Sequence, residues 1–530
     1  MEFIFLHYSL ANTMASSVLP PLPVRQRLAL LLCVCLAALA MPLSFTGPAL
    51  ALGAIHQALG GSPVALNWVT NAFMLAFGAC LMAMGALADA HGRRRVFLSG
   101  LALFVLASLA WTVAPGIASF NLLRALQGLG AAAALAGGGA ALAQAFDGPA
   151  RTRAFSLLGT TFGVGLAFGP FLVGQLMAEA GWRSVGLLLA LMGALAASLA
   201  GRFMPESRDP HAAGLDLRGA VTFTGALGLF TLAVLQAPVW GWAGGGTLAC
   251  FSASVLLLYG FVRTQQQAAR PMLDLSLFRY PRFVGVQCLA AAPAYAYVVL
   301  LVLLPLRLVG IEGHSAADAG RTLMALSAPM LLLPLLAAYL TRWFSSGALC
   351  GSGLLVCAGG LLWLGRCPPG TTGLALTAPL LLIGCGISLP WGLMDGLAVS
   401  VVPKERAGMA TGIFGTVRVA GEGVALALVA AVLAGLVEHQ LTQRVGPTAA
   451  LLAVAQQLAT GNLALAQAAL PGVAADALVQ AYGQAFSLLL YGLAGVTVLT
   501  AGVVFAFLRE PRPVAALHVL ACRNKSSVRL

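Results

Sequence analysis

The sequence predicts an all-α protein that crosses a membrane many times. Hydrophobic residues make up 60% of the chain and charged residues only 8%, and the mean hydropathy is +0.93. Soluble domains contain about 25% charged residues. No Asp, Glu, Lys or Arg occurs between Arg27 and Asp89. At about 20 residues per crossing, this run holds two transmembrane helices joined by a turn at Gly60–Pro63.

Twelve further membrane helices follow from the other runs that carry few charges. The run 219–262 holds two helices, which a glycine-rich break at Trp240–Gly246 separates. The remaining runs hold one helix each and span 96–123, 125–146, 154–178, 184–201, 283–306, 322–341, 343–365, 367–394, 407–437 and 477–508. The prediction is therefore a protein with fourteen membrane helices.

The positive charges predict how these helices are oriented. The chain has a net charge of +13, and 22 of its 29 Lys and Arg residues fall on one side of the predicted helices. This is the pattern of a cytoplasmic face, so the charge does not indicate a nucleic-acid-binding patch. An even number of helices then places both termini in the cytoplasm. The first membrane helix is expected to act as its own uncleaved signal.

The order of the runs predicts two bundles of six helices separated by an inserted pair. Such a duplication indicates two pseudo-symmetric halves with a substrate path between them. The regions are a cytoplasmic extension (1–27), an N-terminal six-helix bundle (28–203), a linker with two extra membrane helices (204–282), a C-terminal six-helix bundle (283–508) with a long outer loop of short amphipathic helices (438–476), and a cytoplasmic tail (509–530).

The first charged stretch after the apolar start reads G-A-L-A-D-A-H-G-R-R-R. Its glycines allow a sharp turn or a close approach of helix ends, and three successive arginines cannot cross a bilayer. The charges by themselves are consistent with a simple topology anchor. The full spacing resembles the loop between helices 2 and 3 of the major facilitator superfamily, which implies a role as a conformational latch. The candidate latch residues are Gly85, Asp89, Gly92, Arg93, Arg94 and Arg95.

Other motifs extend the resemblance to one branch of that superfamily. The segment Arg124–Gly130 resembles the family's buried-arginine motif, and the helix with Gly169–Pro170 resembles the signature of its proton-antiporting exporters. The segments Gly181–Arg183, Pro205–Ser207 and Pro271–Phe278 look like those of fourteen-helix drug:proton antiporters of the EmrB/QacA type. The resemblance implies the major facilitator fold, a bacterial inner-membrane location and a periplasmic adaptor protein as a further partner.

Three departures from this pattern bear on the site. Ser44 stands where many such exporters carry an acidic residue in helix 1, and Val173 stands where a glycine is usual. The loop near Thr341–Phe344 has no acid to match Asp89. The first half therefore lacks one candidate for recognising cations or protons.

Small residues in the predicted fifth helix form a smooth surface. Glycines four positions apart lie on one face and let another helix pack closely, and a proline permits a kink. Plain helix packing explains this pattern as well as a functional hinge does. The resemblance implies a hinge between the two halves, made of Gly159, Gly163, Gly165, Gly169, Pro170 and Gly174.

Three ionisable residues lie at the end of the predicted span 367–394 or within the predicted span 407–437. An ionised side chain at the centre of a membrane helix costs roughly 2.5–3.5 kcal/mol, so each is a functional candidate by default. Asp395 lies near mid-depth of its helix, and Arg418 and Glu422 lie one turn apart on the next, antiparallel helix. They could neutralise one another as a structural pair, with Asp395 satisfied by backbone. In the functional interpretation, Asp395 or Glu422 takes up a proton and loosens its hold on Arg418.

Arg124 and four apolar residues complete the candidate site. The resemblance implies a role for Arg124 in proton relay, whereas its position near a helix end also permits it to reach the membrane surface. Trp68, Phe73, Trp391 and Met394 are candidates for an aromatic substrate cavity suited to flat or cationic compounds. Such residues also serve as packing or interfacial belt residues in membrane proteins.

The sequence thus predicts a proton-coupled antiporter that exports small amphipathic or lipophilic compounds by alternating access. The chain has no G-x-x-x-x-G-K-[ST] loop, so ATP is not its direct energy source. We expect no cofactor besides the coupling proton, no metal site and no enzymatic activity. The expected partners are a small-molecule substrate and the lipid bilayer. An exporter of one specific metabolite and a non-transporting sensor or scaffold are the alternatives.

Overall fold

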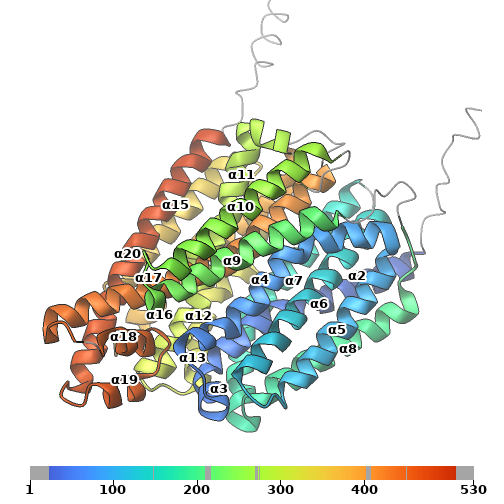
Figure 1. The fold of residues 1–530 in the computed structure, drawn as a ribbon. Helices are drawn as coiled ribbons and strands as arrows, with labels where there is room; N and C mark the ends of the chain where they lie inside the picture. The colour runs from blue at the N-terminus through green and yellow to red at the C-terminus, as the bar shows by residue number, and fades with distance from the viewer. Residues whose placement is uncertain are drawn as a thin grey trace, which may run out of the picture.

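The computed structural model describes residues 23–146, 148–208, 216–268, 273, 275–401, 407–448 and 450–508. Within these residues, 13 helices are long and apolar enough to cross a membrane, and the bent helix α7 adds a fourteenth (Figure 1). The fourteen predicted membrane helices are therefore present. Their form follows from the solvent, because a bilayer offers backbone groups no partners and a single helix satisfies them internally.

The first six spans form the N-half, and local sequence signals set their ends. Ser62 caps α4 by accepting a hydrogen bond from the Ala65 backbone N–H, and Pro63 begins the helix. Gly60, with a φ of +66°, ends the short α3 before this turn. The helices are α2 (Val24–Leu50), α3 (Leu52–Leu59), α4 (Pro63–His91), α5 (Arg93–Trp111), α6 (Ile117–Ala145), α7 (Gly148–Ala180) and α8 (Arg183–Phe203).

The last six spans form the C-half, and prolines interrupt its first span. The span Pro281–Ile311 changes between α and π geometry next to Pro293 and Pro305, since a proline removes a backbone donor from the helix. The C-half elements are η1 (Leu275–Arg279), α11 (Pro281–Pro293), η2 (Ala294–Val298), α12 (Val299–Pro305), η3 (Leu306–Ile311), α13 (Ala316–Ser327), η4 (Ala328–Leu331), α14 (Leu333–Leu340), α15 (Ser346–Leu364), α16 (Leu374–Ser400), α17 (Ala407–Val445) and α20 (Ala475–Phe507).

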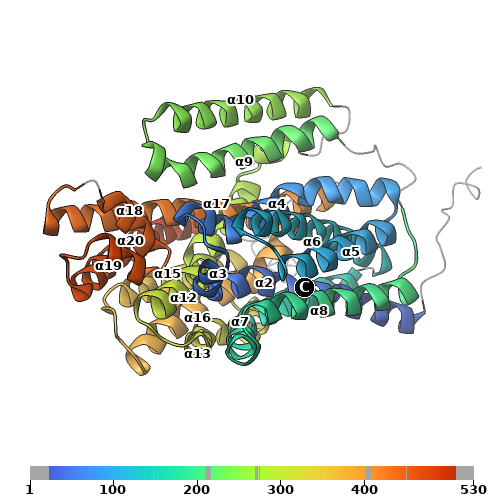
Figure 2. The same cartoon turned by 60° about the horizontal axis from the view of Figure 1, so that its bottom comes forward.

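The inserted helices α9 (Leu217–Trp240) and α10 (Gly245–Gln267) lie as a pair along one side of the two halves (Figure 2). Gly241, with a φ of +82°, lies in the predicted break between them. Helix α9 packs on α4 of the N-half and on α17 of the C-half. Its residues Val234 and Leu235 form a buried cluster with two alanines of α17. The linker pair therefore covers a seam between the halves.

The predicted long loop near the end of the chain contains two short helices. These are α18 (Leu451–Ala459) and α19 (Leu463–Ala469), and α17 continues to Val445 before them. Gly461, with a φ of +77°, lies at the turn of this α18–α19 hairpin and packs directly on Gly310 of η3. The hairpin is thus fixed to the first span of the C-half.

The two halves approach closely where glycines of one half face backbone of the other. At Gly78 of α4, an added Cβ would overlap the backbone of Ala420 in α17. At Gly174 of α7, an added Cβ would lie 2.5 Å from the carbonyl oxygen of Ala316 in α13. Gly320 of α13 approaches the α7 backbone in the same way. Small residues thus allow α4 to pack on α17 and α7 to pack on α13.

Candidate functional site

An ion pair between α16 and α17 is the central feature of the candidate site. Arg418 Nη1 lies 3.5 Å from Asp395 Oδ1, and the two side chains are 14% and 47% exposed. Asp395 also faces the N-half, because a Cβ added to Gly159 of α7 would lie 3.8 Å from its Oδ2. The carboxylate therefore lies where the halves meet, with one side open to a proton or a small ligand.

Three aromatic rings surround the Arg418 guanidinium. Its carbon atom lies 5.7 Å from the ring centre of Phe162, 5.8 Å from that of Trp391 and 5.6 Å from that of Phe414. We call these three rings the aromatic cage. All three distances fall within the range of about 6 Å over which a cation is attracted to a ring face. Phe162 comes from α7 of the N-half, whereas the other two rings come from α16 and α17.

The packing around Trp391 holds the cage in place. Its ring lies 6.4 Å from that of Phe162, nearly parallel at 26°, and 6.3 Å from the edge-on ring of Tyr297. Tyr297 belongs to the π turn η2, and its hydroxyl donates to Ser327 Oγ at 2.8 Å. A neighbouring helix thus fixes the orientation of the tyrosine that packs against the tryptophan.

The third ionisable residue of the predicted group, Glu422, is 1% exposed on α17. Among the described residues, Arg418 forms its ion pair with Asp395 and not with Glu422. The two helical neighbours therefore do not form the structural pair that their spacing permits. Asp395 is held by Arg418 rather than by backbone alone, and Glu422 lies one helical turn away in a buried position.

Arg124 is buried within the N-half and does not reach the membrane surface. Its Nε donates to the Val69 carbonyl at 2.9 Å, and its Nη1 donates to Gln127. Gln127 in turn donates to Ser108 Oγ at 2.6 Å. The guanidinium lies 4.6 Å from the ring centre of Phe73. In the part of the chain that the structure describes, Arg124 is held by neutral groups, and its Nη2 has no hydrogen-bond partner.

The segment from Gly85 to Arg95, predicted as a loop, comprises the end of α4, a tight turn at Gly92 and the start of α5. Arg93 donates to Asp89 Oδ1 from Nε at 2.9 Å and from Nη2 at 2.8 Å, and it also donates to Gln144 of α6. Gly92 has a φ of +111° and allows the sharp turn. A Cβ added to Gly85 would meet nothing within 4 Å.

Glu206, which follows α8, is a partner of this turn that the sequence did not reveal. Its Oε1 accepts a hydrogen bond from the Arg94 backbone N–H at 3.1 Å, and its Oε2 lies 3.6 Å from Arg95 Nε. The Arg94 side chain donates to the Gly201 carbonyl at 2.5 Å. Among the described residues, the partners of this turn thus lie on α4, α6 and α8 and in the segment that directly follows α8.

The glycines of α7 face two different neighbours. Cβ atoms added to Gly165 and Gly169 would meet α2 of the same half, at 2.9 Å from Leu39 O and 3.2 Å from Thr46 Oγ1. Gly159, Gly163 and Gly174 face the C-half, where Gly163 would meet the Met330 carbonyl at 4.0 Å. Helix α7 bends by 41° between its segments Leu157–Leu166 and Phe168–Ala180. Pro170 accounts for this bend, since it cannot donate to the carbonyl four residues earlier.

The four predicted cavity residues fall into three places. Trp391 and Met394 lie on α16, where Trp391 forms part of the aromatic cage and Met394 is fully buried. Phe73 lies under Arg124 in the N-half. Trp68 packs against the cluster of α9 and α17 at the seam. Trp68 and Phe73 therefore do not join the group around Arg418, because their helix directs them to other neighbours.

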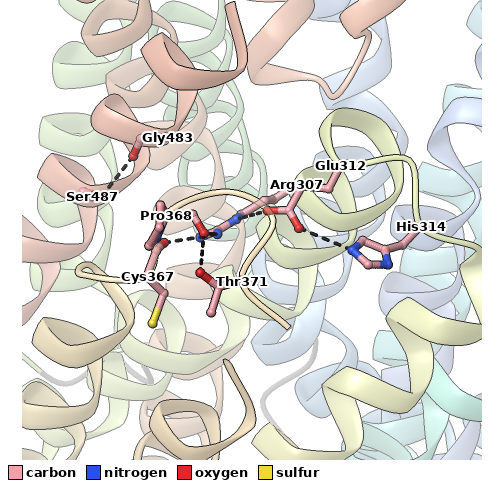
Figure 3. A network of polar contacts seen from close by, with 8 residues as sticks. All are labelled: Arg307, Glu312, His314, Cys367, Pro368, Thr371, Gly483 and Ser487. Atoms are coloured by element: carbon pink, nitrogen blue, oxygen red, sulfur yellow. Dashed lines mark hydrogen bonds and ion pairs between the residues drawn. The ribbon is translucent and has the colours of Figure 1, made fainter. Parts of the chain in front are cut away.

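A buried ion pair in the C-half was missed by the sequence prediction (Figure 3). Arg307 donates from Nε to Glu312 Oε1 at 2.7 Å, and these side chains are 1% and 3% exposed. Arg307 also donates to the carbonyls of Cys367 and Pro368, at 3.2 and 2.8 Å. His314 Nε2 lies 3.5 Å from Glu312 Oε2. The signal in the sequence is an arginine five residues before a glutamate at the end of an apolar run.

The departures noted in the sequence are satisfied locally. Ser44 is buried and its hydroxyl donates to the Ala40 carbonyl at 2.9 Å, so it needs no other partner. Val173 is buried against Gly47 of α2, at 3.4 Å from a Cβ added there. The N-half thus packs closely at these two positions.

Comparison with known proteins identifies the family. The family model described as Major Facilitator Superfamily matches residues 32–426. The multidrug resistance protein Stp of Mycobacterium tuberculosis is 30% identical over 385 residues, which are 72% of each chain. The cephamycin export protein CmcT of Amycolatopsis lactamdurans is 33% identical over 80% of this chain and 90% of its own. The tetracenomycin C resistance and export protein of Streptomyces glaucescens is 28% identical over 91% of this chain and 92% of its own.

Solved structures show the same fold at low identity. The human organic anion transporter MFSD10 superimposes with a TM-score of 0.56 at 18% identity, over 91% of this chain and 100% of its own. A bacterial homolog of the human lysosomal transporter Spinster gives a TM-score of 0.59 at 15% identity, over 92% of this chain and 98% of its own. These matches confirm the fold that the sequence predicted. The chain belongs to the major facilitator superfamily.

Proposed function

We propose that this protein is a proton-coupled exporter of small amphipathic or lipophilic compounds in a bacterial inner membrane. The export of antibiotics and other drugs named for its relatives supports the direction of transport and the class of substrate. The single observation that carries the proposal is the Asp395–Arg418 pair, whose half-exposed carboxylate lies where the two halves meet. The termini and the turn at Gly85–Arg95 would then lie in the cytoplasm.

Proton coupling follows from the charge of one carboxylate. Deprotonated Asp395 attracts Arg418, and protonation removes that attraction. A deprotonated carboxylate can neutralise a bound cationic substrate, whereas a protonated one cannot. Proton and cationic substrate therefore exclude one another at Asp395, which is the requirement for exchange. Glu422, one turn away from Arg418, offers a second proton acceptor on the same helix.

Alternating access would come from rocking of the two halves about this site. Gly159, Gly163 and Gly174 give α7 a smooth face toward the C-half, along which such a movement meets little steric resistance. The turn at Gly85–Arg95 would act as a latch that changes partners between orientations. Arg124, held only by neutral groups in the described chain, would serve in proton relay within the N-half. A periplasmic adaptor protein would carry the substrate onward.

The test is compound-dependent proton movement in inverted membrane vesicles. Vesicles with an imposed inside-acid gradient should release protons when lipophilic cations or neutral lipophilic compounds are added. The double variant Asp395→Asn, Glu422→Gln should lose this release, whereas Asp318→Asn, which changes an exposed carboxylate, should keep it. Unchanged release by the double variant would remove both carboxylates from the mechanism. No release by the wild-type protein with any compound would contradict proton-coupled multidrug export.

A further inference from the structure

The aromatic cage is already occupied by a cation of the protein itself. Three ring centres lie 5.6 to 5.8 Å from the Arg418 guanidinium carbon. Groups of aromatic rings around a positive charge are the way in which proteins recognise quaternary ammonium and related organic cations. Arg418 thus holds the position that an organic cation would take in such a site.

The polar contacts of Arg418 are weak. Its ion pair with Asp395 has an N–O distance of 3.5 Å, at the outer limit of a hydrogen bond. Its Nε is buried and has no hydrogen-bond partner in the described part of the chain. Arg307, by comparison, donates to a carboxylate at 2.7 Å and to two backbone carbonyls. Within the described residues, the Arg418 guanidinium thus has three ring neighbours and one long ion pair.

We propose that Arg418 is an internal competitor for a binding site for planar organic cations, which displace its guanidinium from the aromatic cage and use Asp395 as their counter-ion. This inference rests on the proposed function, because it names how the same site selects its substrate. The Asp395 side chain is 47% exposed, so Arg418 does not close off its carboxylate. Removal of Arg418 frees the rings and also removes a like charge, so it tightens the binding of cations.

The proposal predicts an uncommon result, a variant of a partly buried arginine that binds ligand more tightly than the wild-type protein. We would measure equilibrium binding to the purified full-length protein, with N-methylacridinium as a planar cation and acridine as its neutral isostere. Arg418→Gln should bind N-methylacridinium about tenfold more tightly than the wild type, in line with one cation–π contact. Its affinity for acridine should change less than twofold. Arg321→Gln, which removes an exposed arginine, is the matched control and should change neither affinity.

A second variant separates occupation of the cage from simple charge repulsion. Phe162→Leu in the Arg418→Gln background removes one ring and leaves the charges unchanged. It should lose most of the tenfold gain for N-methylacridinium, because the ring contributes the attraction. An unchanged gain would show that charge removal alone explains the effect and would overturn the proposal. Each variant should first elute as a single species in gel filtration, which establishes that it is folded.

Three further outcomes would also overturn the proposal. These are a weaker or unchanged affinity of Arg418→Gln for N-methylacridinium, an equal gain for acridine, and no measurable binding of N-methylacridinium to either protein. The binding assay needs no proton gradient, so it is independent of the vesicle test. Tighter binding without proton release would refute the proposed function alone, whereas proton release without the gain in affinity would refute the role of Arg418 alone.

Discussion

The buried Arg307–Glu312 pair provides a stability test with an internal control. The substitution Arg307→Gln removes one charge from a pair that is 1% and 3% exposed, and it also removes the donor to the carbonyls of Cys367 and Pro368. Breaking a buried pair from one side costs about 3–5 kcal/mol, because the remaining charge stays buried without its partner. We expect a large fall in the thermal unfolding midpoint of the purified protein.

The control is an exposed pair a few residues away. Arg321 lies 3.0 Å from Asp318, and their side chains are 61% and 51% exposed. Exposed pairs contribute about 0–1 kcal/mol, so Arg321→Gln should leave the midpoint nearly unchanged. The double variant Arg307→Met, Glu312→Leu removes both buried charges and should recover part of the loss. An equal fall in the midpoint for Arg321→Gln and Arg307→Gln, or no fall for Arg307→Gln, would show that burial does not make the Arg307–Glu312 pair important for stability.

Two further predictions concern packing between and within the halves. Gly78→Ala should destabilise the protein by about 1–3 kcal/mol, because the added Cβ overlaps the Ala420 backbone. Gly421→Ala is the control and should have little effect, since its added Cβ meets nothing within 4 Å. Equal thermal unfolding midpoints for the two variants would contradict the close approach at Gly78. Glu206→Ala should loosen the turn before α5, since it removes the partner of the Arg94 backbone N–H and of Arg95. Trypsin cleavage after these arginines should become faster, and an unchanged rate would show that Glu206 does not hold the turn.

The helices were predictable because the bilayer imposes a strong and local rule. A run of about 20 apolar residues satisfies both the solvent and the backbone only as a helix, so counting such runs placed all fourteen. The breaks at Gly60–Pro63 and Trp240–Gly246 were also predictable, since Gly and Pro act on the chain locally. Neither prediction needed knowledge of which helices touch.

The choice among possible partners of a charged residue could not be predicted, because tertiary contacts decide it. The sequence predicted that Asp395 or Glu422 holds Arg418, and the packing makes Asp395 the ion-pair partner. Arg307 ended an apolar run and so was assigned to a loop, although the span continues to Ile311 and buries it. Sequence periodicity shows which face a residue occupies, and only the packing shows what that face meets.

The aromatic cage is built from both halves of the protein. Phe162 belongs to α7 of the N-half, whereas Trp391 and Phe414 belong to the C-half. In the proposed mechanism, rocking of the halves would change the distance between these walls, so the cage would not hold a cation equally well in both orientations. A ligand shifts a conformational equilibrium only through such a difference in affinity. Under the proposed mechanism, the position of Phe162 would therefore let a bound cation favour one orientation, and protonation of Asp395 would release that cation.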